Sequence, residues 1–462
     1  MRQVIQLLPI RAIAKRGVME FLSSALALSR TVRLRKVGSV ARRVPNGEGL
    51  GGSPEPSSAT ASPDATQTCE PLTVLVVVPT LMSGAADAAA LELVRILTNA
   101  GHRAIAVSRG GHLASAIEEA GGEFVRVDVA SKNPLVMLLN IAALVRLIRD
   151  RGAHVVHAHG RTAAWSAYAA SRITGVPFLT TWHKGFRQQN PFKRFYNGVM
   201  TRGVRIIAVS DQLAELINER HGTPLDRIAV VPISIDIDAY DPDQVSQERI
   251  DAVRTSWDVP RDTKVVLIAG RMLRRKGHHV VVKAVRRLKS MGVKDFACVF
   301  MSEMGDEDRQ TRYAAELWDL VLDTDTADVI RFVPPPADLP AVYAAATVLV
   351  SSALQHEGLQ RAILEAQAMA RPVVVSDLGA GREVVLAPPT VPEERMTGLR
   401  TPAGDDAALA AALIRLFSLP DSVRRAIGSR GRAWVCAQFN AAAVAEQTLE
   451  LYAEVVRRNY HG

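Results

Sequence analysis

Cysteine is scarce in this chain of 462 residues, and its scarcity excludes two classes of protein. The three cysteines, Cys69, Cys298 and Cys436, are too widely scattered to frame a disulfide-rich module or to provide the ligand spacing of a zinc site. A reducing compartment is the simple interpretation. Aromatic residues are also few, at 5%, whereas alanine, valine and leucine are abundant. This composition favours helices layered on a parallel sheet.

The body of the chain has no excess of charge of either sign. The formal net charge is +9, but residues 1–46 alone hold ten Lys and Arg against one acid, which gives 10 − 1 = +9. The remaining 462 − 46 = 416 residues are therefore neutral overall. Because nucleic-acid binding needs a basic face, the neutral body argues against a nucleic-acid partner.

The N-terminal region, residues 1–70, lacks a long hydrophobic run. No window in it approaches the roughly 18 uncharged apolar residues that a spanning helix needs. Its first part mixes apolar and basic residues, and its second part is rich in Gly, Pro, Ser and Thr, which predicts a flexible linker. Three interpretations stay open for residues 1–46: a basic amphipathic segment on an anionic membrane surface, an extension without function, or a secretory or organelle signal.

From Leu72 onward, short apolar runs alternate with stretches of helical periodicity. Buried strands of a parallel sheet are predicted at 72–80, 103–108, 154–159, 176–183 and 204–210. Helices are predicted between them, for example over 135–153, and Ser210 or Asp211 is expected to cap the helix that follows the last of these strands. This alternation predicts a doubly wound α/β domain over residues 71–243.

The same pattern restarts at Lys264 and predicts a second domain over residues 244–438. Strands are expected at 264–271, 296–302, 328–334, 347–352 and 371–377. A closing helix over 439–462, capped by Asn440, has one apolar stripe made of Val444, Thr448, Leu451, Tyr452 and Val455. The expected fold class is therefore α/β, with two facing Rossmann-like, doubly wound parallel-sheet domains and ligands in the cleft beyond the strand carboxyl ends.

Two acids eight residues apart flank a predicted helix start in "EGLQRAILE" (357–365). A helix that begins near Leu359 presents unpaired N–H groups to a phosphate, and Gly358 lets the backbone approach a ligand. Eight residues turn a helix by about 80° net over a rise of about 12 Å. Glu357 and Glu365 can therefore hold hydroxyls at two ends of one bent molecule. The alternative is a first-turn acid favoured by the helix dipole and a solvent-facing Glu365, which its apolar neighbours disfavour.

A basic loop, "GRMLRRKG" (270–277), follows the first strand of the second predicted domain. Gly270 permits a tight passage of the chain. Arg271 and Lys276 are expected to project into the cleft as a cation pair, which would answer the two phosphates of a departing nucleotide. Arg274 and Arg275 are interpreted as solvated loop charges.

Together the two motifs resemble the donor site of the family 4 retaining glycosyltransferases, which have the two-domain GT-B fold. The resemblance runs from about Leu72 to Tyr460 and is strongest to bacterial enzymes that build lipopolysaccharide cores or other envelope glycans. It implies transfer of a hexose from a nucleotide-diphosphate sugar to an envelope glycan or lipid-linked acceptor, with retained configuration. It does not imply a metal or another cofactor. The expected location is the cytoplasm, and peripheral attachment to the inner membrane face through residues 1–46 is a hypothesis that depends on their basic charge.

The resemblance assigns roles to the second half of the chain. Glu357 would hold the donor hexose and Glu365 the ribose diol. Arg271 and Lys276, next to Gly270, would hold the diphosphate. Sugar and phosphate oxygens would be reached by the N–H groups of three consecutive residues, Gly358, Leu359 and Gln360. Glu383 would fix the following loop, and Gly379 would be a position of close approach.

In the first half, the resemblance places two residues near the substrates. His159, at the end of the strand in "VVHAHGRT", would face the donor sugar and the acceptor, whereas His157 is interpreted as a packed core histidine. Gly84 would lie near the diphosphate or the acceptor. The catalytic set implied in this way is His159, Arg271, Lys276 and Glu357.

Several loops depart from the family pattern, and this leaves a second hypothesis open. The first strand–helix loop, "LMSGAADAA", has one glycine, and Gln360 stands where the family often has glycine. In this second hypothesis the chain is a degenerate homologue that serves as a binding or scaffold subunit. The scaffold hypothesis is disfavoured because a scaffold has no need to retain both cations, Arg271 and Lys276, and both acids, Glu357 and Glu365. A dinucleotide-dependent oxidoreductase is disfavoured because no G-x-G-x-x-G follows either first strand, and the acid pairs at 236–238 and 323–325 are not interpreted as metal sites.

Overall fold

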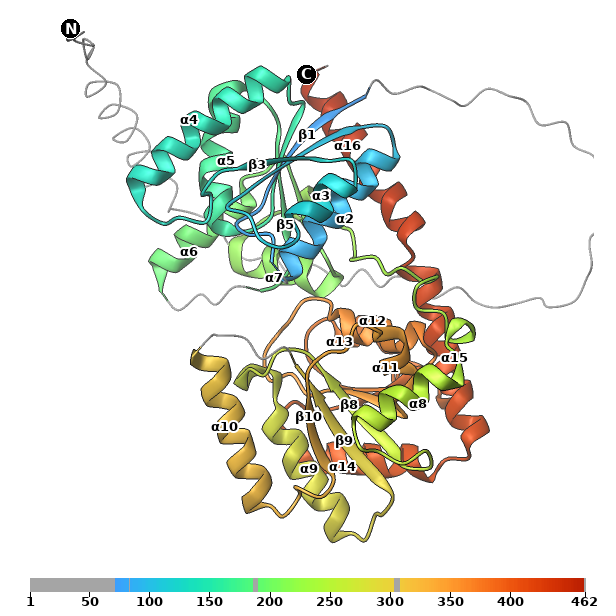
Figure 1. Cartoon of the computed structure of the whole chain (residues 1–462). Coiled ribbons are helices and arrows are strands. Elements are labelled where there is room, and N and C mark those ends of the chain that lie inside the picture. The colour runs from blue at the N-terminus through green and yellow to red at the C-terminus, as the bar shows by residue number, and fades with distance from the viewer. Residues whose placement is uncertain (1–70, 83, 186–189, 303–307, 461–462) are drawn as a thin grey trace, which may run out of the picture. The chain divides into compact units, whose positions relative to one another are not determined.

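The computed structural model describes residues 71–82, 84–185, 190–302 and 308–460, all within the unit Cys69–Gly462. The expectations for residues 1–70 lie outside these ranges. The unit contains two parallel sheets with helices packed around them (Figure 1). The predicted α/β fold with two Rossmann-like sheets is therefore confirmed.

The first sheet has the strand order β3-β2-β1-β4-β5-β6-β7, and all neighbours are parallel. Its strands are β1 (Thr73–Val77), β2 (Arg103–Ser108), β3 (Glu123–Arg126), β4 (Val155–Ala158), β5 (Phe178–Trp182), β6 (Arg205–Ala208) and β7 (Ile228–Val230). All five residues of the central strand β1 are buried, as expected of an apolar run between two helical layers. The strand order reverses between β1 and β4, which is where such sheets bind ligands.

Helices of the first sheet follow its strands in the usual α/β alternation. They are α2 (Ala85–Asn99), α3 (Ala114–Glu119), α4 (Pro134–Arg151), α5 (Arg161–Thr174), α6 (Pro191–Asn197) and α7 (Asp211–His221), with two 3-10 turns, η1 (Gly198–Thr201) and η2 (Leu225–Arg227). The predicted cap of α7 is present, because the Ser210 side chain accepts a hydrogen bond from the Leu213 N–H at 3.2 Å.

The second sheet has the order β10-β9-β8-β11-β12-β13 and is also parallel. Its strands are β8 (Lys264–Ala269), β9 (Phe296–Met301), β10 (Ile330–Val333), β11 (Val348–Ser351), β12 (Val373–Ser376) and β13 (Gly398–Thr401). Its helices are α8 (Gln247–Ser256), α9 (His278–Ser290), α10 (Asp308–Asp323), α11 (Leu339–Ala345), α12 (Arg361–Ala368), α13 (Gly381–Val384), α14 (Asp406–Ser418) and α15 (Asp421–Gln438). Three 3-10 turns complete it: η3 (Pro242–Gln244), η4 (Arg274–Lys276) and η5 (Glu393–Arg395).

The final helix, α16 (Ala441–Tyr460), packs on the first sheet although it follows the second (Figure 1). Asn440 caps it by accepting a hydrogen bond from the Ala443 N–H at 2.8 Å, as expected. Its apolar stripe is buried in the same cluster as β1. The Tyr452 hydroxyl lies 2.5 Å from Nδ1 of His157, so α16 extends the core of the first sheet up to the end of β4.

The loop before α9 is fixed at Gly277, which has φ of +74°. A Cβ on Gly277 would lie 1.9 Å from the Ser352 carbonyl oxygen. We expect Gly277→Ala to lower the free energy of unfolding by at least about 3 kcal/mol, because left-handed strain and a displaced backbone both contribute. Urea titration measures this loss.

Gly292 provides the matched control for that variant. Its φ is +76°, and no atom lies within 4 Å of its Cβ position. Gly292→Ala therefore has the strain without the collision and should cost only about 1 to 2 kcal/mol. Equal losses in the two variants would contradict the assignment of the larger cost to the contact with β11.

Candidate functional site

The basic loop after β8 is held against the end of β11 by hydrogen bonds to two of its carbonyl groups. The Leu354 N–H donates to the Arg275 carbonyl at 2.8 Å, and the Ser352 hydroxyl donates to the Lys276 carbonyl at 3.0 Å. Gly270 opens the loop with φ of +137°, and Arg271 is exposed. The basic loop and the segment that follows β11 are therefore hydrogen-bonded to each other.

Glu357 is the acid at the centre of this junction. Its Oε2 lies 2.5 Å from Nζ of Lys276, and Arg275 pairs with its Oε1. Only 11% of the Glu357 side chain is exposed. The interpretation of Arg275 as a solvated loop charge is therefore wrong, because the 3-10 turn η4 directs it inward, whereas Arg274 is exposed and pairs with Glu316.

Gln360, the N-cap residue of α12, connects the helix start to the same junction. Its Oε1 accepts hydrogen bonds from the Ser351 hydroxyl at 2.8 Å and from Nζ of Lys276 at 3.3 Å. The helix begins at Arg361 rather than near Leu359. Leu359 itself is buried. The structure thus brings Lys276, Glu357 and Gln360 into direct contact.

Glu365 lies in a separate hydrogen-bonding cluster. It is 6% exposed, and its carboxylate accepts hydrogen bonds from the Tyr343 hydroxyl at 2.5 Å and from Nε of Arg361 at 3.0 Å. Burial is the main cause that raises the pKa of Tyr343 well above its usual value, and the nearby Glu365 carboxylate is the second cause. The same two causes raise the pKa of Tyr240. No pattern in the sequence marks these two tyrosines.

On the first sheet, the neighbouring strands β4 and β5 each deliver a histidine from their carboxyl ends. Nδ1 of His159 lies 3.0 Å from Nε2 of His183. Burial is the main cause that lowers the pKa of His159 well below its usual value, and the nearby histidines are the second cause. Burial and then Lys184 lower the pKa of His183 to about 4. Both rings are neutral at pH 7. Among the residues that the structure describes, the other nitrogen of each ring is buried without a hydrogen-bond partner.

His157 has a different environment from its two neighbours. It is 1% exposed, and its ring nitrogens lie 2.5 Å from the Tyr452 hydroxyl and 2.7 Å from the Thr181 hydroxyl. These contacts are those expected of a packed core histidine.

Two contacts join the loops of the two sheets. A Cβ on Gly358 would lie 2.0 Å from the carbonyl oxygen of His183. The Glu383 carboxylate accepts hydrogen bonds from the N–H groups of Asp211, at 3.0 Å, and Gln212, at 2.7 Å, and thus binds the N-terminus of α7. The sequence anticipated a loop-fixing acid at Glu383 without indicating which loop.

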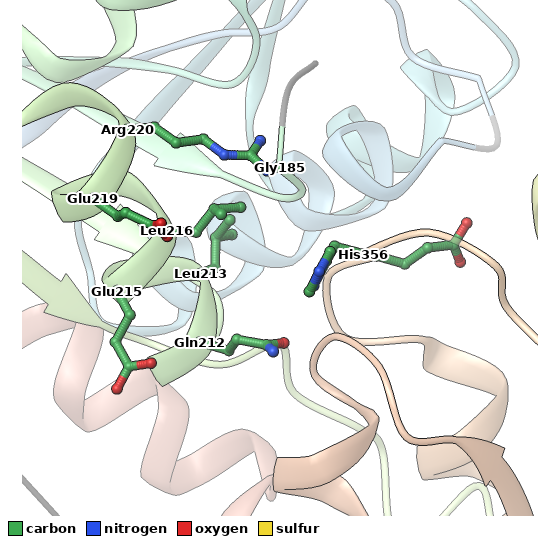
Figure 2. A pocket seen from close by; sticks show the side chains of 9 residues that line it. Gly185, Gln212, Leu213, Glu215, Leu216, Glu219, Arg220 and His356 are labelled. Carbon is green, nitrogen blue, oxygen red and sulfur yellow. The ribbon is translucent and has the colours of Figure 1, made fainter. Parts of the chain in front are cut away.

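A cavity of about 370 Å³ opens beside these contacts (Figure 2). One wall is the α7 face with Gln212, Leu213 and Leu216, and His356 lies across from it (Figure 2). Glu357 also lines the cavity. Glu357, which pairs with the basic loop, therefore borders open space that a ligand can enter.

Five cations from the strand-end loops are linked electrostatically through two lysines, Lys184 and Lys276. We call them the cation cluster: Arg161, Lys184, Arg271, Arg275 and Lys276. Burial, then Arg275 and Arg271, lowers the pKa of Lys276 to about 7. Desolvation, then Arg275, Arg161 and Arg271, lowers the pKa of Lys184. Such mutual repulsion is typical of a site that binds an anion.

Gly84 is the N-cap residue of α2, in the loop after β1. Its N–H donates to the Asp87 carboxylate at 3.1 Å, and a Cβ would lie 3.0 Å from the same carboxylate. These contacts are local, so the structure describes no contact between Gly84 and the cation cluster.

Comparison with known proteins gives consistent matches in both halves. Residues 86–239 match the family model described as Glycosyltransferase Family 4, and residues 263–418 match the model described as Glycosyl transferases group 1. A D-inositol 3-phosphate glycosyltransferase of Saccharomonospora viridis is 26% identical over 318 residues, which are 65% of this chain and 70% of that protein.

Solved structures show the same architecture. A glycosyltransferase from Rickettsia africae superposes with a TM-score of 0.76 and 28% identity, over 84% of this chain and 100% of that one. HepE from Anabaena, solved with UDP-glucose, superposes with a TM-score of 0.70 and 20% identity, over 83% of this chain and 100% of that one. The second likeness is one of fold.

Proposed function

This chain is a glycosyltransferase of family 4, and we propose that it transfers a hexose from a nucleoside-diphosphate sugar to an acceptor hydroxyl with retention of configuration. The observation that carries the proposal is the meeting of Lys276, Arg275 and Glu357 at the edge of a cavity, with Arg271 beside them. A cation group at the carboxyl ends of parallel strands suits a diphosphate.

The proposed reaction needs positioning and charge stabilisation rather than a protein acid and base. The bond between the anomeric carbon and the diphosphate oxygen breaks, and the acceptor oxygen attacks the same face of the sugar. The acceptor proton passes to the leaving phosphate oxygen. Arg271 and Lys276 would stabilise the charge that develops on that oxygen.

Donor binding would also rearrange the pairs seen at the junction. A diphosphate would give Lys276 and Arg275 a new anionic partner, and this would free the Glu357 carboxylate to accept hydrogen bonds from hexose hydroxyls. The N–H groups of Gly358, Leu359 and Gln360 would reach sugar and phosphate oxygens, and Glu365 would take the ribose. His159 has a buried Nε2, without a partner among the residues that the structure describes, to offer a substrate hydroxyl.

Because burial and the neighbouring arginines lower the pKa of Lys276 to about 7, we expect donor-nucleotide affinity to depend on pH. The protonated ammonium binds the diphosphate, so binding above that pKa requires uptake of a proton. The affinity for UDP should fall as pH rises from about 7 to 9, by up to about tenfold per unit. Calorimetry in buffers of different ionisation enthalpy measures both the affinity and the proton uptake.

Lys276→Arg is the matched variant for this pH dependence. A guanidinium stays protonated throughout that range, so the slope should flatten while binding persists. An equal slope in the arginine variant would show that another group titrates.

We propose an envelope glycan or a lipid-linked molecule as the acceptor, at the cytoplasmic face of an anionic membrane. Support comes from α4, whose outer face exposes Leu135, Leu138 and Leu139, and from α6, which exposes Phe192 beside Lys193. None of the helices in the described part of the chain could span a bilayer. Co-sedimentation with anionic and neutral vesicles tests this, and equal binding by a Leu135→Ser/Leu139→Ser variant would contradict it.

The proposed function is tested by calorimetry with UDP-glucose, UDP-N-acetylglucosamine and GDP-mannose. One donor should bind, and Glu365→Ala should weaken it while Arg274→Ala should not. The anomeric configuration of the product, read by NMR, tests retention, and activity that persists in EDTA tests the proposed independence of metal. If no nucleotide sugar binds to the folded protein, the proposed transfer is wrong and the scaffold hypothesis replaces it.

A further inference from the structure

A second cavity, of about 70 Å³, lies over the carboxyl ends of the strands of the first sheet. It is lined by β4, β5 and β6, by the segment that follows β7, and by the helices α2 and α16. Most of its walls are apolar, as Ala88, Val209 and Ile233 illustrate. A buried water needs about 10 to 15 Å³, so the cavity admits one substituent of a ligand but not a whole sugar ring.

This second cavity adjoins the candidate site at the start of α12. Two of its lining residues lie close to the position of a Cβ on Gly358: Cγ2 of Val209 at 3.4 Å and the carbonyl oxygen of His183 at 2.0 Å. Arg361, the first residue of α12, also lines the cavity. A group bound here would therefore be next to residues 358–360, whose N–H groups are expected to reach the donor sugar.

Two histidines give the second cavity a fixed pair of hydrogen-bonding groups. Nδ1 of His159 lies 3.0 Å from Nε2 of His183, so one of these nitrogens is a donor and the other is an acceptor. Each neutral ring carries one N–H, and this contact uses one of the two. The remaining N–H is on Nε2 of His159 or on Nδ1 of His183, whichever tautomers are present. These two nitrogens are buried without a partner among the described residues, so the pair offers a ligand one donor and one acceptor.

A carboxylate completes the polar part of the second cavity. Oε1 of Glu92, on α2, accepts a hydrogen bond from the Ser234 hydroxyl at 2.8 Å, and both residues line the cavity. Arg361, the arginine of the lining, pairs at 3.0 Å with Glu365, which is not a lining residue. An anionic group bound here would face the Glu92 charge and would find one donor at the histidine pair. A hydroxyl suits the site because it both donates and accepts.

We propose that this cavity binds an uncharged hydroxymethyl group of the acceptor sugar, and that Glu92 excludes acceptors with an anionic group at that position. The hydroxyl would bond to the histidine pair and to Glu92, while the methylene would pack on the apolar walls. The inference rests on the proposed glycosyl transfer and defines its acceptor. The group belongs to the acceptor rather than to the donor, because the expected contacts of the donor hexose, Glu357 and residues 358–360, come from the second sheet.

The test uses the full chain saturated with UDP and three series of monosaccharides, based on glucose, galactose and mannose. Each series contains the hexose, its uronic acid, in which a carboxylate replaces the hydroxymethyl group, and its 6-deoxy form, in which a methyl group replaces it. Saturation-transfer NMR measures each Kd. In at least one series we expect the hexose to bind about tenfold or more tightly than the uronic acid, and about threefold or more tightly than the 6-deoxy sugar.

Glu92→Gln separates a role in selectivity from a structural role. The glutamine amide oxygen can still accept the Ser234 hydrogen bond, so the fold should persist, but the negative charge is lost. We expect the preference for the hexose over the uronic acid to fall to about threefold or less. Ser234→Ala keeps the charge and should retain the preference. Glu119→Gln, which removes an exposed acid of α3, should change neither Kd.

Failure of the parent chain to bind UDP would sink the glycosyl transfer itself. If UDP binds, three results would overturn the hydroxymethyl assignment. No hexose would bind, or in every series the hexose would bind no more tightly than its uronic acid or its 6-deoxy form, or folded Glu92→Gln would leave the preference unchanged. If Glu92→Gln instead weakened UDP-glucose but not UDP or the hexose, the group would belong to the donor. Melting temperatures verify the fold of each variant.

Discussion

Lys276→Ala is expected to lower kcat/KM for glycosyl transfer by about 100- to 1,000-fold, the loss typical of one group that stabilises developing charge. Nζ of Lys276 lies 2.5 Å from Glu357 and 3.3 Å from Oε1 of Gln360, which places it where the loops after β8 and β11 meet. Arg275 still pairs with Glu357 in the variant, so no buried carboxylate is left alone. Steady-state kinetics with the donor identified by calorimetry measures the loss.

The matched control lies two residues earlier in the same loop. Arg274 is exposed and pairs with Glu316, so Arg274→Ala should change kcat/KM by less than about twofold. Similar losses in the two variants would contradict the assignment, because they would indicate a disrupted loop rather than a lost cation. The melting temperatures of both variants should remain close to that of the parent.

The central strands of both sheets could be predicted because burial on both faces produces continuous apolar runs. The segments that became β1 and β8 have such runs, and β4 and β5 were found in the same way. Three strands were not predicted: β3, β7 and β13. Each of them lies at an edge of its sheet, and β3, with the sequence EFVR, is only partly buried, whereas the fourth edge strand, β10, was predicted from its apolar run. A short edge strand has no hydrophobic pattern to distinguish it from a loop.

The sequence could predict those residues of the candidate site that follow buried strands of the same sheet. Lys276 and Glu357 both follow buried strands of one parallel sheet, so their meeting could be expected. The sequence could not show which of the neighbouring cations turns inward. The 3-10 turn η4 and its hydrogen bond to the segment after β11 decide this. Arg275 was therefore misread as solvated.

The first-sheet residues show a different limit of sequence reasoning. His183 is the last residue of a predicted strand and Lys184 follows it, beside the predicted strand that ends at His159. A polar pair at that carboxyl end is therefore a signal in the sequence that could have indicated these two residues. Tyr240 and Tyr343 had no such signal, because their contacts with Glu365 depend on how distant elements pack.

Gly358→Ala is expected to reduce kcat by about 100-fold while leaving the Kd of UDP nearly unchanged. The added Cβ would lie 2.0 Å from the His183 carbonyl oxygen and 3.4 Å from Cγ2 of Val209. Because the first of these neighbours is backbone, the loops after β5 and β11 must separate. A displacement of about 1 Å between groups from the two sheets is enough for such a loss of rate, whereas the diphosphate is held by second-sheet loops alone.

Gly198→Ala is the control for this variant, since no atom lies within 4 Å of a Cβ at Gly198, whose φ of −62° suits any residue. Its kcat should equal that of the parent. If Gly358→Ala instead weakened UDP binding as strongly as it lowered kcat, the collision would have distorted the donor loops themselves. A fall confined to kcat in the folded variant would mean that catalysis requires the loop of His183 and Lys184 to reach the bound donor.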